Sequence, residues 1–478
     1  MPETRPNILV IMTDQQRGDA LGCAGHPVLQ TPHLDAIAAQ GVRFANAFTV
    51  SPLCMPARAS FLSGAYPHNH GLWTNRATPS NELPAGDETV FQQLRRAGYH
   101  TGHIGKGHYY SWNLVSHLKE REGYVHGLGF DYVHETTGPH FARHIRSLMT
   151  DHWERLGIYQ TFKAGYGLGS GSGPGGRRRP WDITPHPLSV EEHLDSYVGR
   201  IGKEFIESYQ GSQPFALFVG FGGPHEPWDA PGVYATMYDP AQIPPPIPAA
   251  EPGPWVPEAA AARMRAGRIE GLGGPQAQQV RANYYGKITL IDHWVGQIVD
   301  AVERRGWTNS TLVVFLSDHG EMAGDHQRLH KVVFYESSIR VPLLVSWPGH
   351  TTPGAVADGL AESIDVVPTL LEAAGAPPML RALGRSLWAA LREPPARRRD
   401  DVLSEVRAEQ GGAVNTLMLR TERYKYALDQ EGEGYLLHDL QEDPREQVNL
   451  IGHPAHHALE ADLRERLFRR LVKCQPVR

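Results

Sequence analysis

Four short strand-like segments alternate with helical patterns along much of this chain. Three of the four are nearly continuous in apolar residues, which is typical of strands that are buried on both faces. The four segments are residues 7–12, 99–105, 215–221 and 311–316. Helical spacing occurs at residues 33–40 and 88–97, between the first two segments. Strands that alternate with helices predict an α/β fold with a large mixed, mainly parallel sheet flanked by helices.

Each strand-like segment is followed at once by residues that can bind metals or transfer protons. In chain order these residues are Asp14, then Lys106 and His108, then His225, and finally Asp318 and His319. Any one of these clusters could be an ordinary solvated loop. Ligands of parallel sheets bind beyond the carboxyl ends of the strands, so four such clusters together favour a single site at that edge.

A second pattern begins near residue 400. Short strand-like runs at residues 402–407, 415–420, 424–428 and 434–440 precede a helical stretch at residues 456–472. This order predicts a small C-terminal antiparallel α+β subdomain that is closed by a helix. We therefore expect a catalytic domain over residues 1–399 and a subdomain over residues 400–478. A Gly-rich segment at residues 165–180 is interpreted as a mobile surface loop, and the Pro-rich residues 239–257 as an irregular excursion.

Composition and charge narrow the class of partner. The chain has 478 residues and a formal net charge of −6, without a long basic run, so neither nucleic acid nor a membrane surface is an expected partner. Its 3 cysteines are odd in number and widely spaced, which argues against a disulfide framework. The apolar run at residues 7–12 is too short for a signal-peptide core. We expect a cytoplasmic protein that acts on a small molecule.

Cys54 taken alone is typical of a small buried apolar residue. It stands, however, in the motif C-M-P-A-R, which is followed by A-S-F-L-S-G-A-Y-P-H-N-H-G. Other segments that match the same family in order are T-D-Q-Q-R-G-D, G-Y-H-T-G-H-I-G-K-G-H, P-H-E-P, S-D-H-G-E-M-A-G-D-H and Y-L-L-H-D-L-Q-E-D-P. Together they resemble the sulfatase family of the alkaline-phosphatase-like superfamily. The resemblance leaves out insertions near residues 109–213 and 229–284, where we expect specificity to be encoded.

The resemblance implies a covalent modification of Cys54. In the family this cysteine is oxidised to formylglycine, whose hydrated aldehyde provides a hydroxyl nucleophile, and a formylglycine-generating enzyme is then a transient partner. The local sequence agrees with this role, because Pro56 suits the first turn of a helix. Residue 54 would then lie at a helix N-terminus, where backbone amides and the dipole favour anions. Arg58, near the same helix end, is suited to bind an oxyanion.

The resemblance also implies one divalent metal ion. Its ligands would be Asp14, Gln15, Asp318 and His319, with an oxygen of residue 54 completing the set. Hard oxygen donors favour Ca²⁺. Many family members have Asp-Asp and Asp-Asn at these positions, so Gln15 and His319 depart from the common pattern. The imidazole makes Mn²⁺ or Zn²⁺ credible as well.

Further roles follow from the family pattern. Lys106 matches a cation that binds the sulfate, and His108 matches a base that acts on the second hydroxyl of residue 54. His225 matches the general acid for the leaving oxygen, and Lys331 matches a second sulfate-binding lysine. Asn75 is interpreted equally well as a ligand of a substrate oxygen or as an ordinary turn asparagine.

The sequence thus predicts hydrolysis of a sulfate monoester to an alcohol and sulfate. It does not separate aryl, alkyl, choline and sugar sulfates, and it is compatible with a homo-oligomer. The enzymatic alternative is a phosphonate monoester or phosphodiester hydrolase of the same superfamily. Such relatives tend to lack the Lys-x-His pair, so Lys106 and His108 favour the sulfatase. A more remote alternative is an unmodified, non-catalytic anion-binding protein in which Cys54 stays a thiol.

Overall fold

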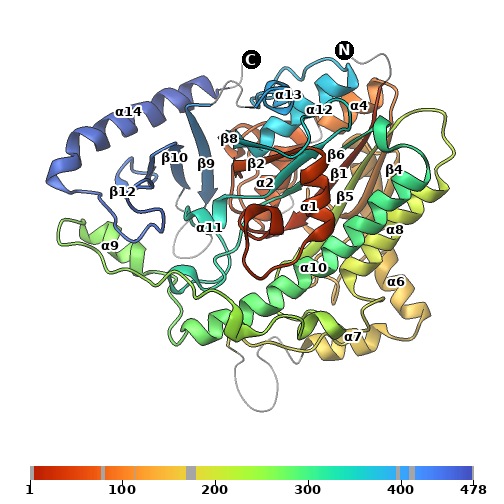
Figure 1. Ribbon diagram of the computed structural model, residues 1–478, viewed down its shortest axis with the longest axis horizontal. Helices are drawn as coiled ribbons and strands as arrows, with labels where there is room; N and C mark the ends of the chain where they lie inside the picture. Colours follow the sequence, from red (N-terminus) through yellow and green to blue (C-terminus); the bar gives the residue numbers. More distant parts are fainter. Residues whose placement is uncertain are drawn as a thin grey trace.

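The computed structural model describes residues 5–76, 81–84, 86–112, 115–167, 179–394, 399–407 and 415–475. Its centre is an eight-stranded sheet with the strand order β4-β3-β5-β1-β6-β7-β2-β8 (Figure 1). The strands are β1 (Asn7–Asp14), β2 (Val42–Phe48), β3 (His100–Lys106), β4 (Tyr132–Thr136), β5 (Phe215–Pro224), β6 (Thr311–Ser317), β7 (Leu343–Ser346) and β8 (Ala355–Glu362).

The four strand-like segments of the sequence form the middle of this sheet. They are the adjacent strands β3, β5, β1 and β6, and every pair among them is parallel. Strand β7 runs antiparallel to both of its neighbours, β6 and β2. The chain reverses its direction after β6, and β7 then pairs directly with β6. The prediction of a mixed, mainly parallel sheet is confirmed.

Helices cover both faces of the sheet, as alternating side chains of β1 illustrate. Leu9 and Ile11 pack on the face covered by α1 (Pro32–Gln40), α8 (Leu194–Ser208) and α10 (Gly274–Arg304). Ile8, Val10 and Met12 belong to the core on the other face, which contains α2 (Cys54–Ser63), α4 (Val90–Arg96), α5 (Glu122–Gly127) and α12 (Val366–Ala374). Period-two burial of this kind fixes the register of a strand buried on both sides.

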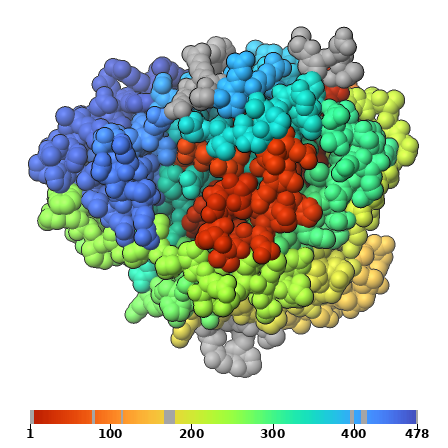
Figure 2. Space-filling model, viewed as in Figure 1, coloured from red at the N-terminus to blue at the C-terminus, as the bar shows by residue number. Residues whose placement is uncertain are grey.

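A separate four-stranded antiparallel sheet has the order β12-β11-β10-β9. It consists of β9 (Asp401–Arg407), β10 (Asn415–Thr421), β11 (Tyr424–Leu428) and β12 (Gly434–Asp439), and α14 (His457–Lys473) covers it. Leu463 and Leu467 of α14 share a core with Leu419 and Leu437 of the sheet. Figure 2 shows this C-terminal region, in blue, on one side of the molecule. The antiparallel α+β subdomain is confirmed, whereas the boundary at residues 399 and 400 stays a prediction.

The other helices are α3 (Pro67–His70), α6 (Leu148–Arg155), α7 (Tyr159–Gly167), α9 (Glu258–Arg265), α11 (Glu336–Ile339) and α13 (Trp388–Arg392). Within the Pro-rich residues 239–257, the only regular element is a short 3-10 turn at Pro240–Gln242. Most of the predicted Gly-rich loop, residues 168–178, lies outside the described residues. Among the described helices, none combines the length and apolar character needed to cross a membrane.

Candidate active site and metal site

Cys54 is the first residue of α2 and is almost completely buried. Leu53 precedes it in an extended conformation, and its apolar side chain forms no capping hydrogen bond. The backbone amide of Met55 donates to Asn75 Oδ1 at 3.0 Å, so Asn75 occupies one of the free amides at this helix end. The first turn of α2 therefore presents amides and a positive dipole end beside residue 54, as the sequence predicted.

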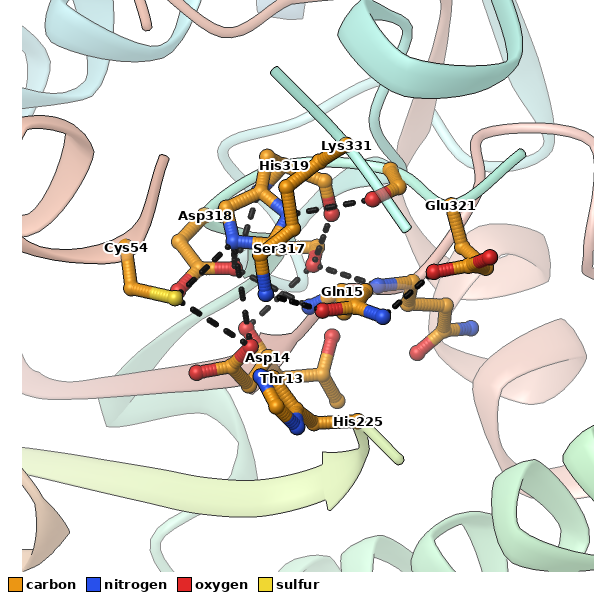
Figure 3. A network of polar contacts seen from close by, with 12 residues as sticks. Thr13, Asp14, Gln15, Cys54, His225, Ser317, Asp318, His319, Glu321 and Lys331 are labelled. Atoms are coloured by element: carbon orange, nitrogen blue, oxygen red, sulfur yellow. Dashed lines mark hydrogen bonds and ion pairs between the residues drawn. The ribbon is translucent and has the colours of Figure 1, made fainter. Parts of the chain in front are cut away.

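Three side chains from the ends of β1 and β6 converge around Cys54 at the start of α2 (Figure 3). Ligand atoms of Asp14, Cys54, Asp318 and His319 all lie within 4.8 Å of one another, and all four residues are buried. Cys54 Sγ is 3.2 Å from His319 Nε2 and 3.8 Å from Asp14 Oδ1. The arrangement follows from the sheet, because β1 and β6 are adjacent, β1 ends at Asp14, and β6 ends directly before Asp318. Two carboxylates, an imidazole and the sulfur form a donor set that fits one divalent cation.

Gln15 is held by a different set of contacts. Its backbone amide donates to Asp318 Oδ1 at 3.0 Å, and its side-chain oxygen accepts a hydrogen bond from Lys331 Nζ. Its side-chain nitrogen donates to Glu226 Oε2 at 2.8 Å and also to Glu321. The two glutamates and Lys331 thus fix the orientation of the amide, with the oxygen on the side of the lysine. The role of Gln15 as a metal ligand stays a prediction.

Buried cations balance the two carboxylates. Arg58 Nε donates to Asp318 Oδ2 at 2.8 Å, and Arg58 Nη2 lies 3.4 Å from Asp14 Oδ2. Lys106 Nζ also binds Asp14. Burial by itself would raise the pKa of Asp14, but Lys106, His225 and Arg58 together hold that pKa well below its usual range. Asp14 is consequently ionised at neutral pH.

The two predicted proton-transfer histidines lie at the ends of neighbouring strands. His108 follows β3 and has a φ of 58°, which is uncommon for a residue other than glycine. His225 follows β5, and its Nδ1 donates to the carbonyl oxygen of Glu226 at 2.7 Å. Burial, followed by the charge of Lys106, lowers the pKa of His108 well below its usual range. Burial also lowers the pKa of His225, against the opposing effect of Glu226.

Sequence reasoning missed several residues of this site. Glu226 and Glu321 lie inside the quoted motifs P-H-E-P and S-D-H-G-E, next to predicted residues, so their motif membership was the available signal. Lys287, in the middle of α10, had no such signal. Its Nζ donates to the carbonyl oxygens of His225 at 2.7 Å and of Pro227 at 3.1 Å. Lys287 therefore holds the turn that carries His225.

Comparisons with known proteins agree with this site. The Sulfatase family model matches residues 6–376, and the model for the C-terminal part of N-sulphoglucosamine sulphohydrolase matches residues 324–473. An arylsulfatase of Clostridium perfringens (strain 13 / Type A) is 31% identical over 469 residues, covering 94% of this chain and 90% of the relative. A choline-sulfatase of Rhizobium meliloti (strain 1021) is 28% identical over 474 residues, covering 95% of this chain and 84% of the relative.

A solved structure extends the likeness to three dimensions. The crystal structure of a phosphonate monoester hydrolase of Agrobacterium radiobacter superimposes with a TM-score of 0.80 and 25% sequence identity. The match covers 98% of this chain and 96% of that one. The resemblance stated from the motifs is confirmed, and the family model spans most of the chain. The chain belongs to the sulfatase family of sulfuric ester hydrolases.

Proposed function

We propose that this protein hydrolyses the sulfate monoester of a small alcohol or phenol, with residue 54 as a formylglycine nucleophile. The observation that carries the proposal is the position of Cys54, at the start of α2 and in contact with Asp14 and His319. In the unmodified chain, Cys54 Sγ stands in for the hydroxyl oxygens of the formylglycine hydrate. A formylglycine-generating enzyme is the partner that this proposal requires.

Three cations, the buried Arg58 and Lys106 and the half-buried Lys331, support binding of the sulfate group. Lys106 and Arg58 reach Asp14, and Lys331 reaches Gln15. Burial opposes the charge of Lys331, but its neighbours Cys54 and Glu226 raise its pKa, so the ammonium group stays charged. These cations and the amides at the start of α2 act in a buried site, where they bind an anion more strongly than in water.

In the proposed first half of the reaction, a hydroxyl of residue 54 that has released its proton to solvent attacks the sulfur with its oxygen. The bond between sulfur and the leaving oxygen breaks, and His225 gives its proton to that oxygen. His225 must be protonated for this step. The negative charge of a bound ester raises the pKa of His225, which opposes the effect of burial.

In the second half, His108 takes the proton of the remaining hydroxyl of residue 54. The electron pair forms the aldehyde C=O bond as the C–O bond to sulfate breaks. Sulfate leaves, and water rehydrates the aldehyde. A buried, neutral imidazole suits this role because it is free to accept a proton, and the pKa of His108 is held low by burial and by Lys106.

The metal ion, when bound, stabilises negative charge on the sulfuryl oxygens. Asp14, Asp318, His319 and residue 54 would hold it, and Gln15 is a further proposed ligand. The oxygen donors favour Ca²⁺, while the imidazole of His319 also suits Mn²⁺ or Zn²⁺. Arg58 orients both carboxylates for this task because it contacts each of them.

A phosphonate monoester or phosphodiester hydrolase is the second candidate function. The structural similarity to the phosphonate monoester hydrolase of Agrobacterium radiobacter favours it. The pair Lys106 and His108 favours sulfate monoesters, because the second half of the sulfatase reaction uses this histidine. The cytoplasmic location and a homo-oligomer stay predictions.

Peptide mass spectrometry over residue 54, combined with turnover assays, tests the proposal. Protein expressed in aerobic cells should carry an aldehyde at residue 54 and should cleave a chromogenic aryl sulfate faster than a phosphonate monoester. Cys54→Ser is the matched control, because it keeps one hydroxyl but cannot form the hydrate. A fully active protein with a thiol at residue 54 would contradict the mechanism. Faster phosphonate turnover in the parent would move the assignment to the second candidate.

A further inference from the structure

We propose that Glu135 is a positioning residue for His108 and acts on it through the indole of Trp112. This inference rests on the proposed function, in which His108 is the base of the second half-reaction. Glu135 lies on β4, next to β3 in the sheet, and its backbone pairs with Gly105, three residues before His108. The carboxylate is buried and had no motif that marked it in the sequence.

The backbone of His108 needs support from its surroundings. A φ of 58° places this residue in the left-handed region, which is unfavourable for a residue with a Cβ. The preceding Gly107 is packed closely as well. A Cβ on Gly107 would lie 3.1 Å from Glu135 Oε1 and 2.9 Å from His103 Nε2. The turn that carries His108 is therefore shaped against the Glu135 carboxylate.

The His108 ring is oriented by stacking. It lies on the indole of Trp112 with ring centroids 4.2 Å apart and an interplanar angle of 17°. Its Nδ1 is buried and has no hydrogen-bond partner among the described residues. Catalytic histidines are usually oriented by a hydrogen bond to the nitrogen that does not react. Here the orientation depends on Trp112 instead.

Glu135 in turn fixes Trp112. Trp112 Nε1 donates to Glu135 Oε1 at 3.2 Å, and the Tyr110 hydroxyl donates to Glu135 Oε2 at 2.9 Å. The backbone amide of His108 also stabilises the charged carboxylate. The segment from His108 to Trp112 thus directs two side-chain donors, those of Tyr110 and Trp112, to one carboxylate. Glu135→Gln replaces one of the two acceptor oxygens with an N–H donor, so Tyr110 and Trp112 can no longer both donate to this side chain.

Among the described residues, no cation forms an ion pair with this carboxylate. Burial is the main influence on Glu135 and raises its pKa to about 7, while Arg121 has the smallest of the opposing effects. A buried acid without an ion pair is costly for folding. Its contacts serve the segment that carries Lys106 and His108, which indicates a role in the site.

The inference makes a prediction about one half of the reaction only. In the first half, the S–O bond to the alcohol breaks and residue 54 becomes sulfated, without any step by His108. In the second half, His108 must remove the hydroxyl proton before the C–O bond to sulfate breaks. A displaced His108 ring therefore slows sulfate release and leaves alcohol release unchanged.

The test is rapid-mixing kinetics of Glu135→Gln with a chromogenic aryl sulfate. We expect a burst of phenol equal to the number of modified active sites, at the rate of the parent protein. Steady-state turnover should then fall about 100-fold, the size of effect that a displacement of about 1 Å produces. Mass spectrometry of the quenched protein should find a sulfuryl group on the peptide of residue 54. A fall in both phases together, without the sulfated peptide, would overturn the inference.

Glu405→Gln is the matched control, since Glu405 is a fully buried carboxylate of the other sheet that binds His68 at 2.6 Å. An equal burst in this variant would also refute the role of Glu135. If Glu135→Gln does not fold, Trp112→Phe keeps an aromatic ring for stacking but is smaller and lacks the N–H donor, and it should produce the same burst. A parent protein with a thiol at residue 54 and no phenol release overturns the proposed function itself, and this inference with it. If the parent cleaves only a phosphonate ester, the same burst is measured with that substrate.

Discussion

Glu135 also makes a quantitative prediction about the pH dependence of stability. Burial raises the pKa of this carboxyl group from 4.5 to about 7 in the folded protein. The unfolded chain therefore releases the proton at lower pH than the folded protein does. Between these two pKa values the folded state binds more protons, so its contribution to stability is full below pH 4.5 and is lost as the pH rises towards 7.

The size of the effect follows from the shift. A change of one pKa unit corresponds to about 1.4 kcal/mol, so a shift from 4.5 to about 7 amounts to about 3 kcal/mol. Glu135→Gln has no proton to lose at this position. Relative to the parent, its free energy of unfolding should therefore increase by about 3 kcal/mol between the acid and the alkaline end of this range.

Urea denaturation of both proteins at a series of pH values measures this difference. Contributions from the other titrating groups cancel, because only residue 135 changes. A difference in unfolding free energy that stays constant with pH would refute the reasoning. A difference that falls as the pH rises would show that the hydrogen bonds from Tyr110 and Trp112 stabilise the anion more than burial destabilises it.

Three further substitutions test other parts of the molecule. His225→Ala should slow cleavage of alkyl sulfates by about 10² to 10⁴-fold but affect nitrophenyl sulfate much less, because a good leaving group needs no acid; rates across a series of leaving groups measure this. His319→Ala should weaken divalent-metal affinity by roughly 10-fold or more, as measured by competition with a chromophoric chelator. Glu362→Gln should lower the unfolding free energy by about 3–5 kcal/mol in urea titrations, because Glu362 is buried and binds Arg399 and Arg470 at 3.1 Å each.

The positions of the strands could be predicted because the central strands are buried on both faces. A strand such as β1 has apolar side chains towards two helical layers, and this leaves a continuous apolar run in the sequence. Polar residues begin where that run ends, so the edge that carries Asp14 and Asp318 could be predicted as well. The direction of β7 could not be predicted, since hydrophobicity does not encode which strands become neighbours.

The supporting residues of the site were harder to find. Lys287 and Glu135 act through backbone carbonyls and through neighbouring side chains, and such contacts join segments that are far apart in the chain. Residue type and local spacing contain no information about these partners. Glu135 in addition lies in the insertion at residues 109–213, which the family motifs do not cover. The structure was needed to connect it with His108.

The charges of the site explain why it can bind both a metal ion and an anionic ester. Asp14 and Asp318 are the carboxylates beside residue 54, and Arg58, Lys106 and Lys331 are the cations around them. Because Arg58 and Lys106 keep Asp14 ionised, metal binding at neutral pH does not require this group to lose a proton. Lys106 and Lys331 also attract the negatively charged ester. Replacing Lys106 would therefore weaken the binding of the ester and also remove an ion pair that keeps Asp14 in place. The effects of this substitution on metal affinity and on substrate affinity should therefore be coupled.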